Sequence, residues 1–68
     1  MRVNTTGQPG PFAVGDRVVA TEGIGLIRPR VPRGTVGIVA AYSPAGEVEV
    51  QFVNGRVELL KPGLLAAA

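Results

Sequence analysis

The chain of 68 residues contains no cysteine, no histidine and no tryptophan. Without cysteine it can form no disulfide bond and has no thiol nucleophile, and without cysteine and histidine the usual zinc ligand sets are missing. The lack of histidine also removes the side chain that most often acts as a general acid or base near neutral pH. These absences exclude most catalytic and metal-binding mechanisms, so we expect a protein that is not an enzyme and has no cofactor.

Long hydrophobic runs are also missing. No apolar stretch approaches the roughly 20 residues of a membrane-spanning helix, and residues 1–7 lack the hydrophobic segment of a secretory signal peptide. We therefore expect a cytoplasmic protein without a membrane partner. A chain of this length has room for one domain, which buries only roughly 60% of the surface that its unfolded form exposes. We expect a small core and a surface available to a partner.

The charge is small in total but unevenly placed. Seven basic and five acidic residues give a formal charge of +2. Arg28, Arg30 and Arg33 lie in one stretch without an acid, and the seven basic residues less these three leave four against all five acids. The sequence thus predicts one basic loop on a nearly neutral body.

Residues 33–42, Arg-Gly-Thr-Val-Gly-Ile-Val-Ala-Ala-Tyr, form the longest β-favouring run, and the rest of the chain reads as leading into it or pairing with it. Gly34 and Gly37 precede and interrupt its β-branched residues. An isolated glycine in such a pattern marks a bulge or a close backbone approach, as at the corner of a small barrel. The run predicts a strand that starts at a tight turn and bends sharply.

The segments before this strand differ in composition. Residues 1–12 are polar and rich in turn formers, which predicts a disordered tail, with Phe12 at its end and the nearby Val14 able to fold back onto the domain. Residues 13–21 predict the first strand, entered through a turn in which the Asp16 carboxylate bonds nearby amides. Residues 22–33 predict a long loop, stiffened by two prolines, that holds its arginines out.

The segments after it predict two hairpins. Residues 43–46 suit a turn, and residues 47–52 alternate polar and apolar side chains as in a strand with one buried face. Asn54-Gly55 favours a two-residue type I′ turn. With that turn Phe52 faces Val57 and Val50 faces Leu59, so Val57 and Leu59 point inward.

Two further expectations concern the other ends of these strands. If Tyr42 lies opposite Glu47, then Gly37 and Val39 point inward while Ile38 and Tyr42 point outward, which leaves an apolar outer strip. Pro62 ends the last strand, so we expect a turn or one 3₁₀ turn that brings residues 64–65 back against the core, and a frayed end at residues 66–68.

These elements give an all-β prediction: a single small barrel of four to five antiparallel strands with a long first loop, over residues 13–65. Strands of this kind, the Asn-Gly hairpin and the proline-broken final turn resemble an SH3-like small β-barrel. Within that architecture, the sequence resembles the KOW-type domains of ribosomal and transcription-elongation proteins. The resemblance lies in Gly15-Asp16-Arg17-Val18, in Gly34-Thr35-Val36-Gly37-Ile38-Val39, and in the apolar positions Val48, Val50, Val57 and Leu64. That resemblance implies binding to RNA or to a neighbouring protein.

A second resemblance adds the segment Arg28-Pro29-Arg30-Val31-Pro32-Arg33 between those two motifs. With it, the sequence is similar to the barrel domain of the nitrile hydratase β subunit and of the small electron-transport accessory subunits. Members of those families use the barrel to dock on a larger enzyme. The resemblance therefore implies an accessory module without an active site of its own.

Two hypotheses follow for the site. In the first, the module docks on a larger protein or enzyme assembly through Arg28, Arg30, Arg33, Ile38 and Tyr42. The competing structural interpretation is that the chain's own loop or tail covers Ile38 and Tyr42.

In the second hypothesis, the module binds RNA or DNA through Arg28, Arg30, Arg33 and Arg56, with phosphate contacts supplying most of the affinity. The sequence leaves a homo-oligomer open under either hypothesis.

Overall fold

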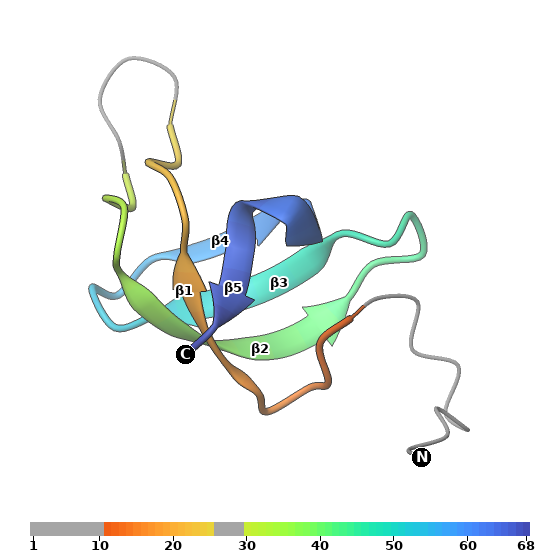
Figure 1. Cartoon of the computed structure of the whole chain (residues 1–68). Coiled ribbons are helices and arrows are strands. Elements are labelled where there is room, and N and C mark those ends of the chain that lie inside the picture. Colours follow the sequence, from red (N-terminus) through yellow and green to blue (C-terminus); the bar gives the residue numbers. More distant parts are fainter. Residues whose placement is uncertain (1–10, 26–29) are drawn as a thin grey trace.

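The computed structural model describes residues 11–25 and 30–68, and in this part the chain forms one five-stranded antiparallel sheet (Figure 1). The elements in chain order are β1 (Arg17–Ala20), β2 (Val36–Tyr42), β3 (Val48–Phe52), β4 (Val57–Leu60), the 3₁₀ turn η1 (Pro62–Leu64) and β5 (Leu65–Ala67). The order across the sheet is β4-β3-β2-β1-β5, so the last strand returns to pair with the first. The all-β prediction is confirmed.

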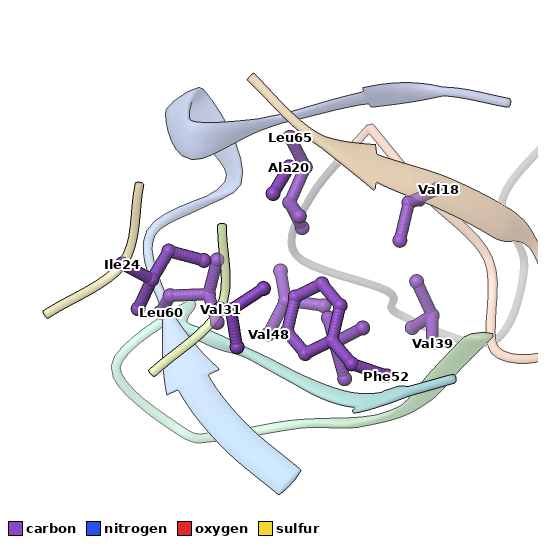
Figure 2. Close-up of a cluster of buried hydrophobic side chains, with 10 residues drawn as sticks. Val18, Ala20, Ile24, Val31, Val39, Val48, Phe52, Leu60 and Leu65 are labelled. Carbon is purple, nitrogen blue, oxygen red and sulfur yellow. The ribbon is translucent and has the colours of Figure 1, made fainter. Parts of the chain in front are cut away.

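The core consists of small and branched apolar side chains that point to the inner side of the sheet (Figure 2). Its members come from every strand and from both sides of the long first loop: Val18, Ala20, Ile24, Val31, Val39, Val48, Val50, Phe52, Leu60 and Leu65. Ile24 and Val31 form an isolated β-bridge, which places them over the inner face. The loop thus contributes to the core as well as connecting two strands.

The glycines of the central strand act as the sequence predicts. Gly34 has a φ of +90° in the turn before β2, where the Thr35 N–H donates to the Pro32 carbonyl. Gly37 is buried, and a Cβ there would lie 2.6 Å from Val50 Cγ1 and 3.0 Å from the Gln51 carbonyl oxygen. The predicted close backbone approach is therefore confirmed at Gly37.

The β2–β3 register is confirmed in its first half and wrong in its second. Gly37 lies opposite Phe52 and Val39 opposite Val50, as predicted, but the register then shifts between Val39 and Ala41. The extra residue of this bulge places Tyr42 opposite Val48 instead of Glu47. Tyr42 consequently packs against the core and is not part of an outer strip.

The β3–β4 hairpin differs from the predicted type I′ turn by one residue. The Gly55 N–H donates to the Phe52 carbonyl, and Gly55 has a φ of +91°, whereas Asn54 has no positive φ. The loop is therefore a type I turn followed by a glycine in the left-handed region, a three-residue connection. Gln51 now faces Val57, and the prediction that Val57 and Leu59 point inward is wrong, because both are exposed.

The segment before β1 is held in place by a turn at Asp16 and by the contact of Phe12 with the core. The Asp16 carboxylate accepts a hydrogen bond from the Ala13 N–H at 2.8 Å, which confirms its predicted turn role. Phe12 packs against the core as predicted, and its N–H donates to the Tyr42 hydroxyl at 3.0 Å. Val14 remains 58% exposed, so the same expectation is wrong for that residue. The predicted tail lies outside the described residues apart from Pro11 and Phe12.

The C-terminal segment is more ordered than the sequence predicts. Pro62–Leu64 forms the expected 3₁₀ turn, and Leu65 returns to the core. Residues 66–68 are not frayed, because Ala66 and Ala67 belong to β5 and the Ala68 N–H donates to the Arg17 carbonyl. Three alanines show no alternation of polar and apolar side chains, so the sequence does not indicate that this segment forms a strand. The pairing is made by main-chain hydrogen bonds.

Candidate functional site

Exposed apolar side chains gather on β2, the β3–β4 turn and β4, on the side of the sheet that faces away from the core. The exposed fractions are 40% for Ile38, 76% for Val53, 56% for Val57 and 53% for Leu59. Directly opposite residues of an antiparallel ladder share a face, so Ile38, Gln51 and Val57 form one row across the three strands. We call the surface made by these five residues the outer face.

The outer face is bordered by one charge of each sign. Arg17 lies on β1 opposite Ile38, and Glu49 lies on β3 opposite Leu59. Gln51 at its centre is neutral. An apolar strip with a polar border has the composition of a protein-binding patch, in which the middle excludes water and the border provides orientation.

The first loop is fastened to the β3–β4 hairpin from the opposite side of the sheet. The guanidinium of Arg30 donates from Nε to Glu58 Oε2 at 3.0 Å and from Nη2 to Glu58 Oε1 at 3.1 Å. Asn54 Nδ2 also donates to the Arg30 carbonyl at 3.1 Å. These three bonds join segments that are 24 to 28 residues apart in sequence, and we call them the loop clasp.

The ion pair in the clasp changes the acidity of both partners. The hydrogen bonds from Arg30 hold the pKa of the Glu58 carboxyl below its ordinary value, although partial burial opposes this effect. The same pairing raises the pKa of Arg30. Glu58 therefore stays charged over a wider pH range, and the charge of Arg30 is compensated within the chain.

The structure does not bring the predicted site residues together. Arg28 lies outside the described residues, Arg30 is paired with Glu58, and Tyr42 packs against the core. Arg33 and Arg56 are exposed, and among the described residues neither side chain forms an ion pair. Ile38 is exposed as predicted and, among the residues that the structure describes, is the one predicted docking residue that lies on the outer face.

Sequence reasoning missed three members of the outer face, Val53, Val57 and Leu59. Asn-Gly suits a two-residue turn, but it equally suits a three-residue loop in which only the glycine needs a positive φ. The choice moves every residue of β4 to the other face. One signal was available: with the longer loop Leu60 instead of Leu59 enters the core, two residues before Pro62 begins the η1 turn.

Within residues 11–25 and 30–68, no three acidic side chains lie close enough together to hold a metal ion. In the same part of the chain, no helix has the length and apolar character needed to cross a membrane. Comparisons with protein-family models, with curated proteins and with solved structures find no match. The structure is that of a small all-β protein with a five-stranded antiparallel sheet.

Proposed function

We propose that the chain is a non-catalytic docking module that binds a larger protein or enzyme assembly through the outer face. The observation that carries the proposal is the exposure of four large apolar side chains on β2, the β3–β4 turn and β4, beside the β3 residue Gln51. Surface residues of this kind are ordinary when scattered, but a contiguous group marks an interaction site. The proposal replaces the arginine loop with the sheet as the main contact.

We propose further that the fold is of the SH3-like small-barrel type. The long first loop, the Asn-Gly hairpin, the proline-containing 3₁₀ turn and the return of β5 to β1 support this assignment. The loop clasp supports it as well, because it draws the first loop toward the β4 edge over the core. A rigid small barrel suits a docking module, since little conformational entropy is lost when its face is buried.

The chemistry of the face defines the partner that fits it. Isoleucine, valine and leucine side chains on this face complement an apolar protein surface, and the charges of Arg17 and Glu49 complement one acidic and one basic group. Nucleic acid is the alternative ligand, through Arg28, Arg33 and Arg56. It is less favoured because Arg30 is engaged by Glu58, which leaves fewer cations for phosphate.

The test compares two substitutions of exposed apolar residues in the full-length chain. Ile38→Lys places a charge on the outer face, and Val14→Lys places the same charge at a valine outside it. Affinity capture from the source cell is performed with each variant and with the wild type, with and without nuclease. The proposal expects one protein to be captured by the wild type and by Val14→Lys but not by Ile38→Lys, regardless of nuclease.

Two results would overturn the proposal. The first is equal capture by Ile38→Lys and the wild type. The second is a nuclease-sensitive partner that is lost instead when Arg33 and Arg56 are replaced with alanine. A thermal melt of each variant is the control, because lysine at an exposed position is expected to change the free energy of unfolding by no more than about 0.5 kcal/mol.

A further inference from the structure

The two edges of the sheet are formed by β4 and β5, and they differ in what they offer to another strand. The Phe52 N–H of β3 donates to the carbonyl of Arg56, the residue just before β4. Because main-chain groups alternate in direction along a strand, Arg56 and every second residue after it, including Glu58, direct their N–H and C=O groups toward β3. The alternate residues Val57 and Leu59 therefore direct their N–H and C=O groups away from β3. In the described part of the chain, none of these four groups has a backbone partner.

The β5 edge is protected against pairing with another strand, and the β4 edge is not. β5 has three residues, and the Leu65 N–H is already bonded to the Pro62 carbonyl of η1. Natural sheets also protect edges with lysine, proline or inward-pointing charges. In β4 the only charge, Glu58, is paired with Arg30, and Lys61 and Pro62 follow only after the strand has ended. Val57 and Leu59 thus combine exposed side chains with unpaired main-chain groups.

We propose that a second copy of this chain occupies the β4 edge and forms a symmetric dimer by antiparallel strand pairing. The register places Val57 of one copy opposite Leu59 of the other, and the two-fold axis passes between the two Glu58 residues. Because a two-fold interface uses the same surface twice, each Val57 N–H meets a Leu59 C=O and each Leu59 N–H meets a Val57 C=O. All four outward groups of each copy are satisfied in this one register.

The charges near the axis fit the same arrangement. Like charges directly opposite on neighbouring strands are destabilising, so two facing carboxylates need compensation. Each Glu58 already receives two hydrogen bonds from its own Arg30. In the proposed register Arg56 of the second copy lies diagonally across from Glu58, within the reach of a long side chain. The axis then carries two carboxylates among four guanidinium groups.

The proposed dimer leaves the outer face accessible and enlarges it. Val57 and Leu59 of the two copies become neighbours in one continuous sheet, so the apolar row beginning at Ile38 extends across the axis. The dimer and the docking function use different groups of β4, because pairing uses the main-chain groups of its edge whereas docking uses side chains of the face. Substitutions can therefore separate them.

The test measures the mass of the full-length chain by light scattering or sedimentation over a range of concentrations. Val57→Pro removes the outward N–H while leaving the β3–β4 bonds in place, since proline is tolerated where an edge N–H faces solvent. Two such donors are lost per dimer, which is expected to raise the dissociation constant about 5- to 100-fold. Ile38→Lys is the matched control and is expected to leave dimerisation unchanged.

Val57→Lys is a second disrupting variant that keeps the N–H, in case the proline variant fails to fold. It places two charges beside the axis and is expected to weaken the dimer as well. A wild-type chain that remains monomeric up to roughly 1 mM would overturn the proposal. A folded Val57→Pro or Val57→Lys variant that dimerises as tightly as the wild type would also overturn it.

Discussion

The close approach of β2 to β3 at Gly37 predicts that Gly37→Ala destabilises the protein. A Cβ at this position would lie 2.6 Å from Val50 Cγ1, 3.0 Å from Phe52 Cδ1 and 3.0 Å from the Gln51 carbonyl oxygen. Val50 and Phe52 are 0% and 4% exposed, so neither can move into solvent. The third contact is to backbone, which can yield only by separating the two strands.

The magnitude is the balance of two opposing effects. Gly37 does not have a positive φ, so alanine is allowed there and would stabilise the protein by about 0.4–1 kcal/mol through the unfolded chain. Overpacking a well-packed core costs about 1–3 kcal/mol, and here three contacts are too short at once. The net expectation is a loss of about 1–2 kcal/mol, or roughly 5–15 °C in Tm for a domain of this size.

The assay is thermal and urea unfolding of the wild type and two variants. Gly63→Ala is the matched control, because Gly63 has no heavy atom within 4 Å of the added Cβ and no positive φ. It is expected to melt within a few degrees of the wild type. A Gly37→Ala variant that melts at or above the wild-type temperature would refute the reasoning, since it would show that the two strands do not meet this closely.

Three further predictions concern the hairpin, the loop clasp and the N-terminal contact. Gly55→Val is expected to lower the free energy of unfolding by more than about 1 kcal/mol, because a β-branched residue resists the φ of +91° there; urea denaturation measures this. Pairing with Arg30 lowers the pKa of Glu58 below its ordinary value of 4.5. The Arg30–Glu58 pair therefore stabilises the fold above about pH 4.5, and this stabilisation is lost as the pH falls and Glu58 becomes protonated. Melting curves of Glu58→Gln should depend less on pH in this acidic range than those of the wild type; equal dependence would contradict the pairing. Tyr42→Phe removes the acceptor for the Phe12 N–H and is expected to lower the free energy of unfolding by about 0.5–1.5 kcal/mol, and an unchanged melt would count against that hydrogen bond.

The parts of the fold that were predictable from the sequence depend on strong local chemistry. Alternation in residues 47–52 identified β3 and its buried face, and Gly37 between β-branched residues indicated a close approach. Pro62 predicted the end of β4 and the 3₁₀ turn. In each case the local sequence leaves the main chain or the buried face of the strand little choice.

The errors in the two hairpins concern register, which depends on loop length and bulges instead of composition. One extra residue in the β3–β4 loop exposed Leu59 and buried Leu60, and one bulged residue in β2 turned Tyr42 toward the core. Because side chains alternate with a period of two, each shift reversed the faces of all residues beyond it. The candidate site was affected most, since it is defined by which face a residue occupies.

The long-range pairing of Arg30 with Glu58 was also not predictable from the sequence with any precision. The two residues are 28 positions apart, and several acids were equally available. Their pairing depends on the Ile24–Val31 bridge, which orients the loop over the inner side of the sheet. A basic stretch that suggested a free anion-binding loop thus contributes in part to the structure itself.

Site-specific photo-crosslinking in the source cell tests most directly whether the outer face is the docking surface. A crosslinking residue is placed at Gln51, the centre of the face, and in a separate experiment at Arg33, which lies in the turn before β2. We expect a discrete protein adduct from position 51 that is unaffected by nuclease and is weak or missing from position 33. Adducts from position 33 alone, and above all adducts to nucleic acid, would contradict it.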